Sequence, residues 1–204
     1  MRRRDREVTN RQQILSIIES CDVCRLGFVD GNMPYVVPMC FACQVNEDES
    51  ITLYFHSAGD GRKVDIMQKN PNVAFEMDTA HKLFDNATDA CGFGMKYQCV
   101  MGTGTVRFLT EKDEKVPVLD MIMKHYTKKH LPYLPEFIDA TLIIALDVKE
   151  ITCKVNEKAF IYPYPLVGYG FSVIKNKTVY TVGQKKRTDQ RPVLFSKGIM
   201  VSFR

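Results

Sequence analysis

A series of short, strand-like segments joined by tight turns constrains this chain more than any other feature. The clearest pair is VCRLGFV at 23–29 and YVVPMCFACQV at 35–45, which lie on either side of the turn DGN at 30–32. Two such runs around a tight turn predict an antiparallel hairpin. Pro34 and Pro38 cannot donate hydrogen bonds to a sheet, so we expect a bulge or an open edge near Pro38, where backbone groups are free for another partner.

The rest of the chain continues this pattern with few helices. Thr9 and Gln12 form a possible capping box at the start of a helix over about 10–20. A glycine-containing loop leads into a short helix that ends before Pro71, and a second long helix is expected at 111–129, whereas 79–95 is irregular. Further strands are expected at 51–56, 73–78, 97–109 and 140–152. This order favours a mainly β fold with peripheral helices, a closed or partly closed antiparallel barrel.

The length of 204 residues suits one hydrophobic core with an appendage. We expect one domain over 1–154. Beyond it, the segment FIYPYPLVGYGF is rich in aromatic residues, proline and glycine, so 155–204 is interpreted as a C-terminal extension with extra strands. An appended hairpin over a barrel edge and a detached tail are the two alternatives for this extension.

Charge and apolar content indicate a cytoplasmic protein without a membrane or nucleic-acid partner. The longest apolar stretch, LIIAL at 142–146, is too short to span a bilayer, and the N-terminal MRRRDREVTNR lacks the apolar core of a signal peptide. The net charge of +4 is modest, and small basic clusters at 2–6 and 185–187 are typical of solvated chain ends. In this compartment the seven cysteines should stay reduced.

Four cysteines match the spacing of a zinc ribbon, namely Cys21, Cys24, Cys40 and Cys43. However, neither pair contains the glycine or proline that a sharp zinc knuckle requires, and residues 40 and 43 of a continuous strand face opposite sides. Neither pair leads into a helix N-terminus, as a thioredoxin-like pair would. We therefore expect small buried side chains and no metal, with a zinc-dependent nucleic-acid module as the lesser alternative.

The segment HSAGDGRK at 56–63 combines a strand end, two glycines and a helix start that carries two cations. Cations at a helix N-terminus oppose the helix dipole, which is tolerable when an anion binds there. The Ser57 hydroxyl, Arg62, Lys63 and backbone amides could form a phosphate site, although the spacing of a P-loop is absent. A solvated helix start is the alternative.

Several motifs in order resemble one known family. They are CRLGFVDGNMPYVVPMCFAC, ITLYFHSAGDGRKVDIMQKNPNVAFEMD, GMKYQCVMGTGTVRF and MKHYT, and together they cover roughly 1–154. The chain resembles the pyridoxamine 5'-phosphate oxidase-like FMN-binding proteins, most of all the branch of the 5-nitroimidazole-resistance proteins. The resemblance implies a six-stranded antiparallel Greek-key split β-barrel and a homodimer with FMN at the interface.

The resemblance also implies where the cofactor lies. One stretch would run along the edge of the flavin ring and offer backbone hydrogen bonds, and it comprises Val37, Pro38, Met39 and Cys40. Phe55, His56 and Ser57 would continue this wall, and Arg62 and Lys63 would hold the FMN phosphate. Tyr97 and Gln98 would reach across from the other subunit, and Gln98 stands where many relatives carry arginine.

These residues suggest a flavin-dependent reductase of small electron-poor substrates, nitroaromatic or quinone-like, with an unidentified electron donor. His56 could donate a proton or orient the substrate, or it could be a hydrogen-bonded histidine at a strand end. The rival interpretation is a non-catalytic protein that binds FMN or haem.

Overall fold

The computed structural model describes residues 2–84, 93–127, 129–157, 172–175 and 178–181. The chain divides into two units, 1–159 and 160–204. In the second unit, the described residues form two antiparallel strands, β9 (Ser172–Lys175) and β10 (Thr178–Thr181). The boundary that we expect at 154 stays a prediction, and most of the C-terminal extension lies outside the described residues.

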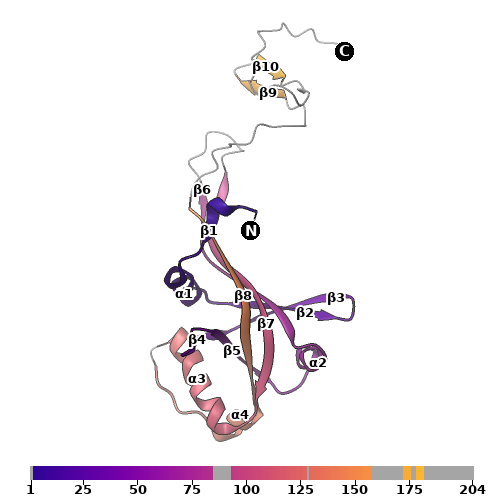
Figure 1. The fold of residues 1–204 in the computed structure, drawn as a ribbon, viewed down its shortest axis with the longest axis vertical. Coiled ribbons are helices and arrows are strands. Elements are labelled where there is room, and N and C mark those ends of the chain that lie inside the picture. Colours follow the sequence, from indigo (N-terminus) through magenta and orange to yellow (C-terminus); the bar gives the residue numbers. More distant parts are fainter. Residues whose placement is uncertain (1, 85–92, 128, 158–171, 176–177, 182–204) are drawn as a thin grey trace. The chain divides into compact units, whose positions relative to one another are not determined.

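The first unit is built on one antiparallel sheet, in the order β3-β2-β6-β7-β8-β5-β4, with β1 paired to β8 (Figure 1). Its strands are β1 (Glu7–Val8), β2 (Cys24–Asp30), β3 (Met33–Met39), β4 (Phe41–Val45), β5 (Ile51–Ala58), β6 (Asn72–Phe84), β7 (Gly94–Leu109) and β8 (Thr141–Asn156). The mainly β antiparallel fold is confirmed. The expected number of six strands is wrong, because the described residues form a sheet of eight.

The predicted strand at 35–45 is in fact two strands. β3 ends at Met39 and β4 begins at Phe41, and these two strands lie at opposite ends of the sheet order. A single residue, Cys40, thus connects the two ends. The sheet must curl until its ends meet at Cys40, and because β3 and β4 are not paired with each other, the result is a split barrel.

The helices lie around this barrel and are η1 (Arg4–Arg6), α1 (Arg11–Glu19), α2 (Arg62–Lys69), α3 (Lys112–Tyr126) and α4 (Pro135–Ala140). The expected capping box is wrong by one residue. Asn10, not Thr9, caps α1, and its Oδ1 accepts a hydrogen bond from the Gln13 backbone N–H at 3.0 Å. None of the described helices has both the length and the apolar character needed to cross a bilayer.

Two apolar clusters stabilise the unit. The interior cluster includes Phe41 and Phe55, both 0% exposed, and the α1 residues Ile17 and Ile18 close one part of it. The second cluster lies where α3 packs on the outer face of the sheet, with Tyr54 and other buried residues beneath it. Burial of each large side chain contributes about 1.5–3 kcal/mol.

β6 continues beyond the predicted end of its strand. The irregularity expected after 78 is a bulge between Thr79 and Lys82, where Ala80 has a φ of 57°, after which pairing with β7 resumes up to Phe84. The described part of 79–95 is therefore mostly strand, and 85–92 lies outside the described residues.

Candidate functional site

β3 has one open edge, as expected near Pro38. Among the described strands it pairs with β2 alone, and opposed residues of an antiparallel pair alternate between hydrogen-bonded and non-hydrogen-bonded positions. Proline has no N–H that could bond to β2, so Pro34 and Pro38 occupy non-bonded positions. Val36 has the same place in the alternation, so the backbone groups of all three residues point away from β2. The open edge therefore presents three carbonyls and the N–H of Val36. Val37 and Met39 direct their backbone groups toward β2, so they are less suited to a ligand than the alternate residues.

β5 extends past the end of its neighbour β4. Its pairing with β4 stops at Phe55, whereas His56, Ser57 and Ala58 pair with β8 alone. The Phe55 side chain points into the core, so only its backbone is available to a ligand. His56 is exposed and its side chain has no hydrogen bond or ion pair with any described residue, and the Ser57 hydroxyl donates to the Ala58 carbonyl at 2.8 Å.

The break at Cys40 is held by the last turn of α3. The hydroxyl of Tyr126 accepts a hydrogen bond from the Phe41 N–H at 3.0 Å and donates one to the Asp22 carbonyl at 2.8 Å. Burial, with a contribution from the nearby Cys40 thiol, raises the pKa of Tyr126 to about 12, so the phenol stays protonated at neutral pH. The interpretation of the sequence missed this contact, because nothing in a local pattern links residues 104 positions apart.

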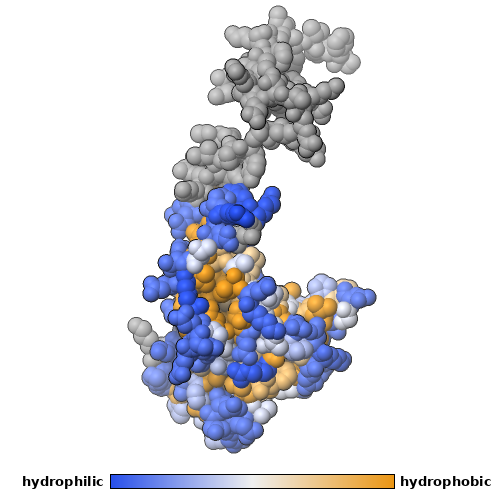
Figure 2. All heavy atoms as spheres, viewed as in Figure 1, coloured by the Kyte–Doolittle hydropathy of each residue, from blue (hydrophilic) through white to orange (hydrophobic). Residues whose placement is uncertain are grey.

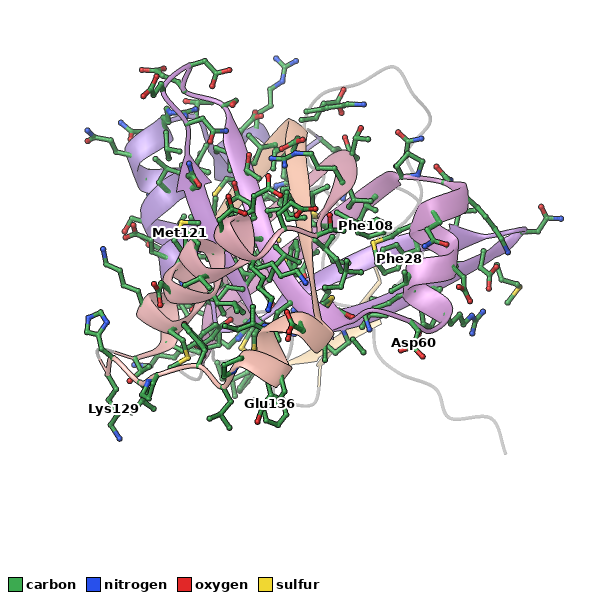
Figure 3. The ribbon with its side chains drawn as sticks, turned by 90° about the horizontal axis from the view of Figure 1, so that it is seen from below. Phe28, Asp60, Phe108, Met121, Lys129 and Glu136 are labelled. Atoms are coloured by element: carbon green, nitrogen blue, oxygen red, sulfur yellow. The ribbon has the colours of Figure 1, made fainter. Side chains whose placement is uncertain are left out.

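The N-terminus of α2 lies beside the β2–β3 hairpin. Arg62 donates to Asp30 at the end of β2, with Nε–Oδ2 at 2.9 Å, and its guanidinium carbon lies 4.3 Å from the ring centroid of Tyr35 in β3. In Figure 3, Asp60 marks this end of α2, close to the hairpin. No side chain caps the helix, and its first backbone donors are Val64 and Asp65, so no described residue accepts from the two preceding amides. Lys63 is half-exposed and has no ion pair with any described residue.

Tyr97 and Gln98 are far from the rest of the predicted site. They lie near the start of β7, whereas Phe108, eleven residues on, is the β7 residue level with Ile144 and Phe55. At about 3.3 Å per residue, the eleven residues from Tyr97 to Phe108 span roughly 35 Å along the strand. One chain therefore brings together the predicted residues at 37–40, 55–57 and 62–63 but not Tyr97 or Gln98.

The cysteines with zinc-ribbon spacing lie in different environments. Cys21 and Cys24 are buried in the core, Cys40 is exposed at the break, and Cys43 packs partly buried against the core. Burial and the nearby carboxylates raise the pKa of Cys21 to about 12, which disfavours the thiolate. Among the described residues, which include these four, no three potential ligands lie close enough to hold a metal ion.

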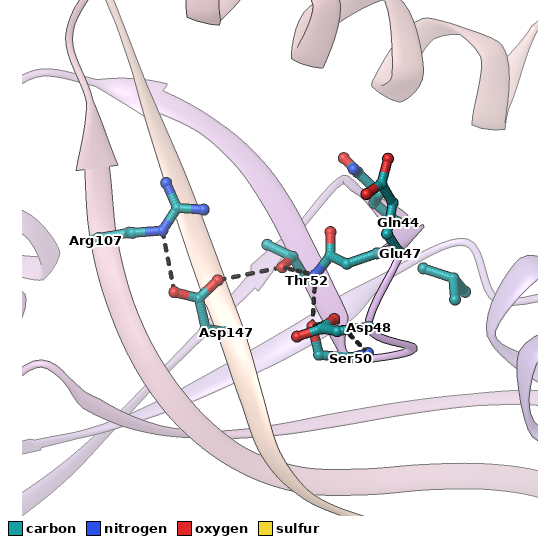
Figure 4. Close-up of a pocket in the computed structure, with 9 residues that line it drawn as sticks. Gln44, Glu47, Asp48, Ser50, Thr52, Arg107 and Asp147 are labelled. Carbon is teal, nitrogen blue, oxygen red and sulfur yellow. Dashed lines mark hydrogen bonds and ion pairs between the residues drawn. The ribbon is translucent and has the colours of Figure 1, made fainter.

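A polar hollow at the β4–β5 turn contains none of the predicted site residues (Figure 4). Its side chains satisfy one another: Arg107 donates to Asp147 at 3.0 Å, Thr52 donates to Asp147 at 3.2 Å, and Asn46 donates to Thr52 at 3.1 Å. These bonds join the turn to β7 and β8. The polar side chains of the hollow therefore have a structural role, because they hold the turn against the two strands.

The chain matches the model of a known protein family. The family model of pyridoxamine 5'-phosphate oxidase matches residues 10–155, which include every predicted site residue. The chain matches no curated protein sequence.

Solved structures share the fold. A protein from Bacteroides thetaiotaomicron described as a 5-nitroimidazole antibiotic resistance protein is 35% identical, with a TM-score of 0.63, over 73% of this chain and 86% of that one. A flavocytochrome from Azotobacter vinelandii is 16% identical, with a TM-score of 0.68, over 94% and 86% of the two chains. An FAD- and haem-binding protein from Mycobacterium smegmatis is 16% identical, with a TM-score of 0.65, over 76% and 75%. At 16% identity these last two are similar in fold alone.

Proposed function

Because the chain belongs to the pyridoxamine 5'-phosphate oxidase family, we propose that it binds FMN and reduces small electron-poor substrates, such as nitroaromatics or quinones. The observation that carries the proposal is the contact of Arg62 with Tyr35, which brings the uncapped start of α2 beside the open edge of β3. A phosphate site and a hydrogen-bonding edge for a planar ring are thus neighbours. The 35% identity to a 5-nitroimidazole resistance protein favours nitroaromatic substrates.

The start of α2 fits a phosphate. The backbone amides of Arg62 and Lys63, the partial positive charge of the helix N-terminus and the Lys63 ammonium would all face an anion there. Asp30 already holds the Arg62 guanidinium at the hairpin, at 2.8 Å from Nη2 to Oδ2, so little side-chain entropy would be lost on binding.

The open edge of β3 fits the ring. One of the carbonyls of Pro34, Val36 and Pro38 would accept a hydrogen bond from the ring N–H, and the Val36 N–H would donate to a ring carbonyl. Bound FMN would supply the electrons for substrate reduction. The protein's part is to bind the ring, to orient the substrate against it and to supply protons.

His56 is the proposed proton donor. It lies on the part of β5 that extends beyond β4, is exposed, and is not held by any described side chain. Reduction of a nitro group to a nitroso group takes two electrons and two protons and releases water. A histidine imidazole can donate such protons near neutral pH.

A second copy of the chain would complete the site. Tyr97 and Gln98 lie roughly 35 Å along β7 from the level of Phe55, so in this proposal they come from the partner of a homodimer. Figure 2 shows apolar side chains gathered over the long strands beside the hairpin, on a surface that a monomer rarely exposes. This surface supports an interface between two copies.

The cofactor is tested first by absorption and mass spectrometry of the purified full-length protein. The proposal expects a yellow protein that bleaches on reduction and releases one FMN per chain on denaturation. A Soret band without flavin would favour the haem-binding alternative. A colourless protein that takes up no added FMN would refute the flavin proposal.

Two substitutions then test the roles of the residues. Lys63→Met should raise the Kd of FMN about tenfold by removing one charged contact, whereas Lys69→Met at the other end of α2 should not. His56→Ala should slow single-turnover oxidation of the photoreduced protein by a nitroaromatic about 100-fold with FMN still bound. His130→Ala, an exposed histidine in the segment before α4, is the control. An unchanged rate in His56→Ala would exclude the proton-donor role.

A further inference from the structure

The last turn of α3 joins the two sides of the barrel split, which is the unpaired junction between β3 and β4 at Cys40. Tyr126 is the first link, because its hydroxyl bonds to Phe41, which begins β4, and to Asp22, which lies two residues before β2. β2 carries β3 at one end of the sheet, and β4 is the other end. One hydroxyl group therefore connects the two ends that no strand pairing connects.

His125 is the second link. Its Nε2 lies 2.9 Å from the Cys21 carbonyl, which can only accept, so Nε2 carries the proton and donates. The His125 ring also packs against Phe41, with ring centroids 4.6 Å apart, and against Tyr126 at 4.7 Å. Both side chains thus contact the chain just before β2 and the first residue of β4.

We propose that Tyr126 and His125 are positioning residues that set the width of the split, and so hold Cys40 and the open edge of β3 in place relative to His56. The effect on cofactor and substrate rests on the proposed function, but the effect on the split does not. Neither residue is expected to touch the substrate.

The topology explains why such a link is needed. In the part of the chain that the structure describes, β3 has a partner on one side only, and a single residue joins it to β4. Sheet pairing therefore does not define the distance between the open edge of β3 and the end of β5. Without the Tyr126 hydroxyl, the Phe41 N–H loses its acceptor at the point where the β4–β5 ladder ends. The backbone around Cys40 would then open more often to solvent.

The test compares Tyr126→Phe with Tyr133→Phe. Tyr133 is the matched control, because its hydroxyl also makes a hydrogen bond, to Asp120 of α3 at 3.0 Å, but lies outside the split. Backbone amide exchange at Phe41 should be about tenfold faster in Tyr126→Phe than in the wild type and unchanged in Tyr133→Phe. His125→Phe keeps an aromatic ring but loses the bond to Cys21, so it should also speed exchange and serves as the second variant if Tyr126→Phe does not fold. Equal exchange rates at Phe41 in the wild type and in both split variants would overturn the proposal.

FMN binding is measured separately in the same proteins. With FMN saturating, the bound flavin in Tyr126→Phe should have a shifted absorption maximum and a Kd raised about tenfold, whereas a loss of stability alone would leave the spectrum at saturation unchanged. A wild-type spectrum in the saturated variant would overturn the role toward the flavin. If the wild type itself binds no FMN, the proposed function fails, while the amide exchange at Phe41 still decides whether these residues hold the split.

Discussion

Replacing Gly102 with alanine should destabilise the first unit by about 3 kcal/mol. A Cβ atom at this position would lie 2.5 Å from Cζ and 2.6 Å from Cε1 of Phe75, and in collision with the Glu150 carbonyl oxygen. Phe75 is 3% exposed within the core, and the Glu150 oxygen belongs to the β8 backbone, so neither can move away cheaply. Overpacking typically costs about 1–3 kcal/mol, and two fixed neighbours place this substitution at the upper end.

The control for this prediction is Gly27→Ala. A Cβ at Gly27 would meet only Ala74, with its O at 3.7 Å and its Cβ at 3.8 Å, which are ordinary contacts. Thermal unfolding followed by circular dichroism should show a Tm for Gly102→Ala about 6–12 °C below the wild type, since about 1 kcal/mol shifts a domain of this size by about 2–4 °C. If the Gly102 and Gly27 variants unfold within about 2 °C of each other, the close approach of β7 to Phe75 and β8 is not as described.

Two further predictions concern titratable groups. Burial opposes ionisation of Asp78, but hydrogen bonds from Arg25 and His81 outweigh it and lower its pKa below 3.8. Its contribution to stability is therefore complete above about pH 4 and is lost as the pH falls through the lowered value, so urea unfolding of Asp78→Asn should depend less on pH in this range. Burial raises the pKa of Cys24, whereas Cys40 is exposed, so mass spectrometry after brief alkylation should find Cys40 labelled and Cys24 unlabelled until the protein unfolds. Equal labelling of both would contradict the assigned burial.

Most of the helices and strands could be predicted from local sequence patterns. The apolar runs and turns of the sequence predict β2, β5 and β7 with small errors at their ends, and the expected helix at 111–129 is α3 at Lys112–Tyr126, with residue 128 outside the described residues. A Cβ at Gly102 or Gly104 would collide with the β8 backbone, so the glycines of GTGT stand where β7 approaches β8 closely. The cap of α1 could also have been predicted from the sequence, because Asn10 is as good a capping residue as Thr9.

The break at Cys40 could not be predicted in this way. Residues 35–45 have a continuous strand pattern, and the chain divides there because β3 and β4 find partners at opposite ends of the sheet. The bulge at Ala80 could not be predicted either, because a positive φ is unusual for alanine and no glycine or asparagine marks the position.

Some features of the candidate site could likewise be predicted from the sequence, and others are set by contacts between distant residues. The sequence by itself determined that backbone groups near Pro34 and Pro38 are free of sheet hydrogen bonds, because proline has no N–H. It also determined that two cations stand at the start of α2, because this follows from the order of residues at the helix end. Only the tertiary structure decided that Phe55 points into the core, that Tyr97 lies far from His56 within one chain, and that Tyr126 bridges the split. These features depend on contacts between residues that are distant in the chain, and only the closing of the sheet into a split barrel brings such residues together.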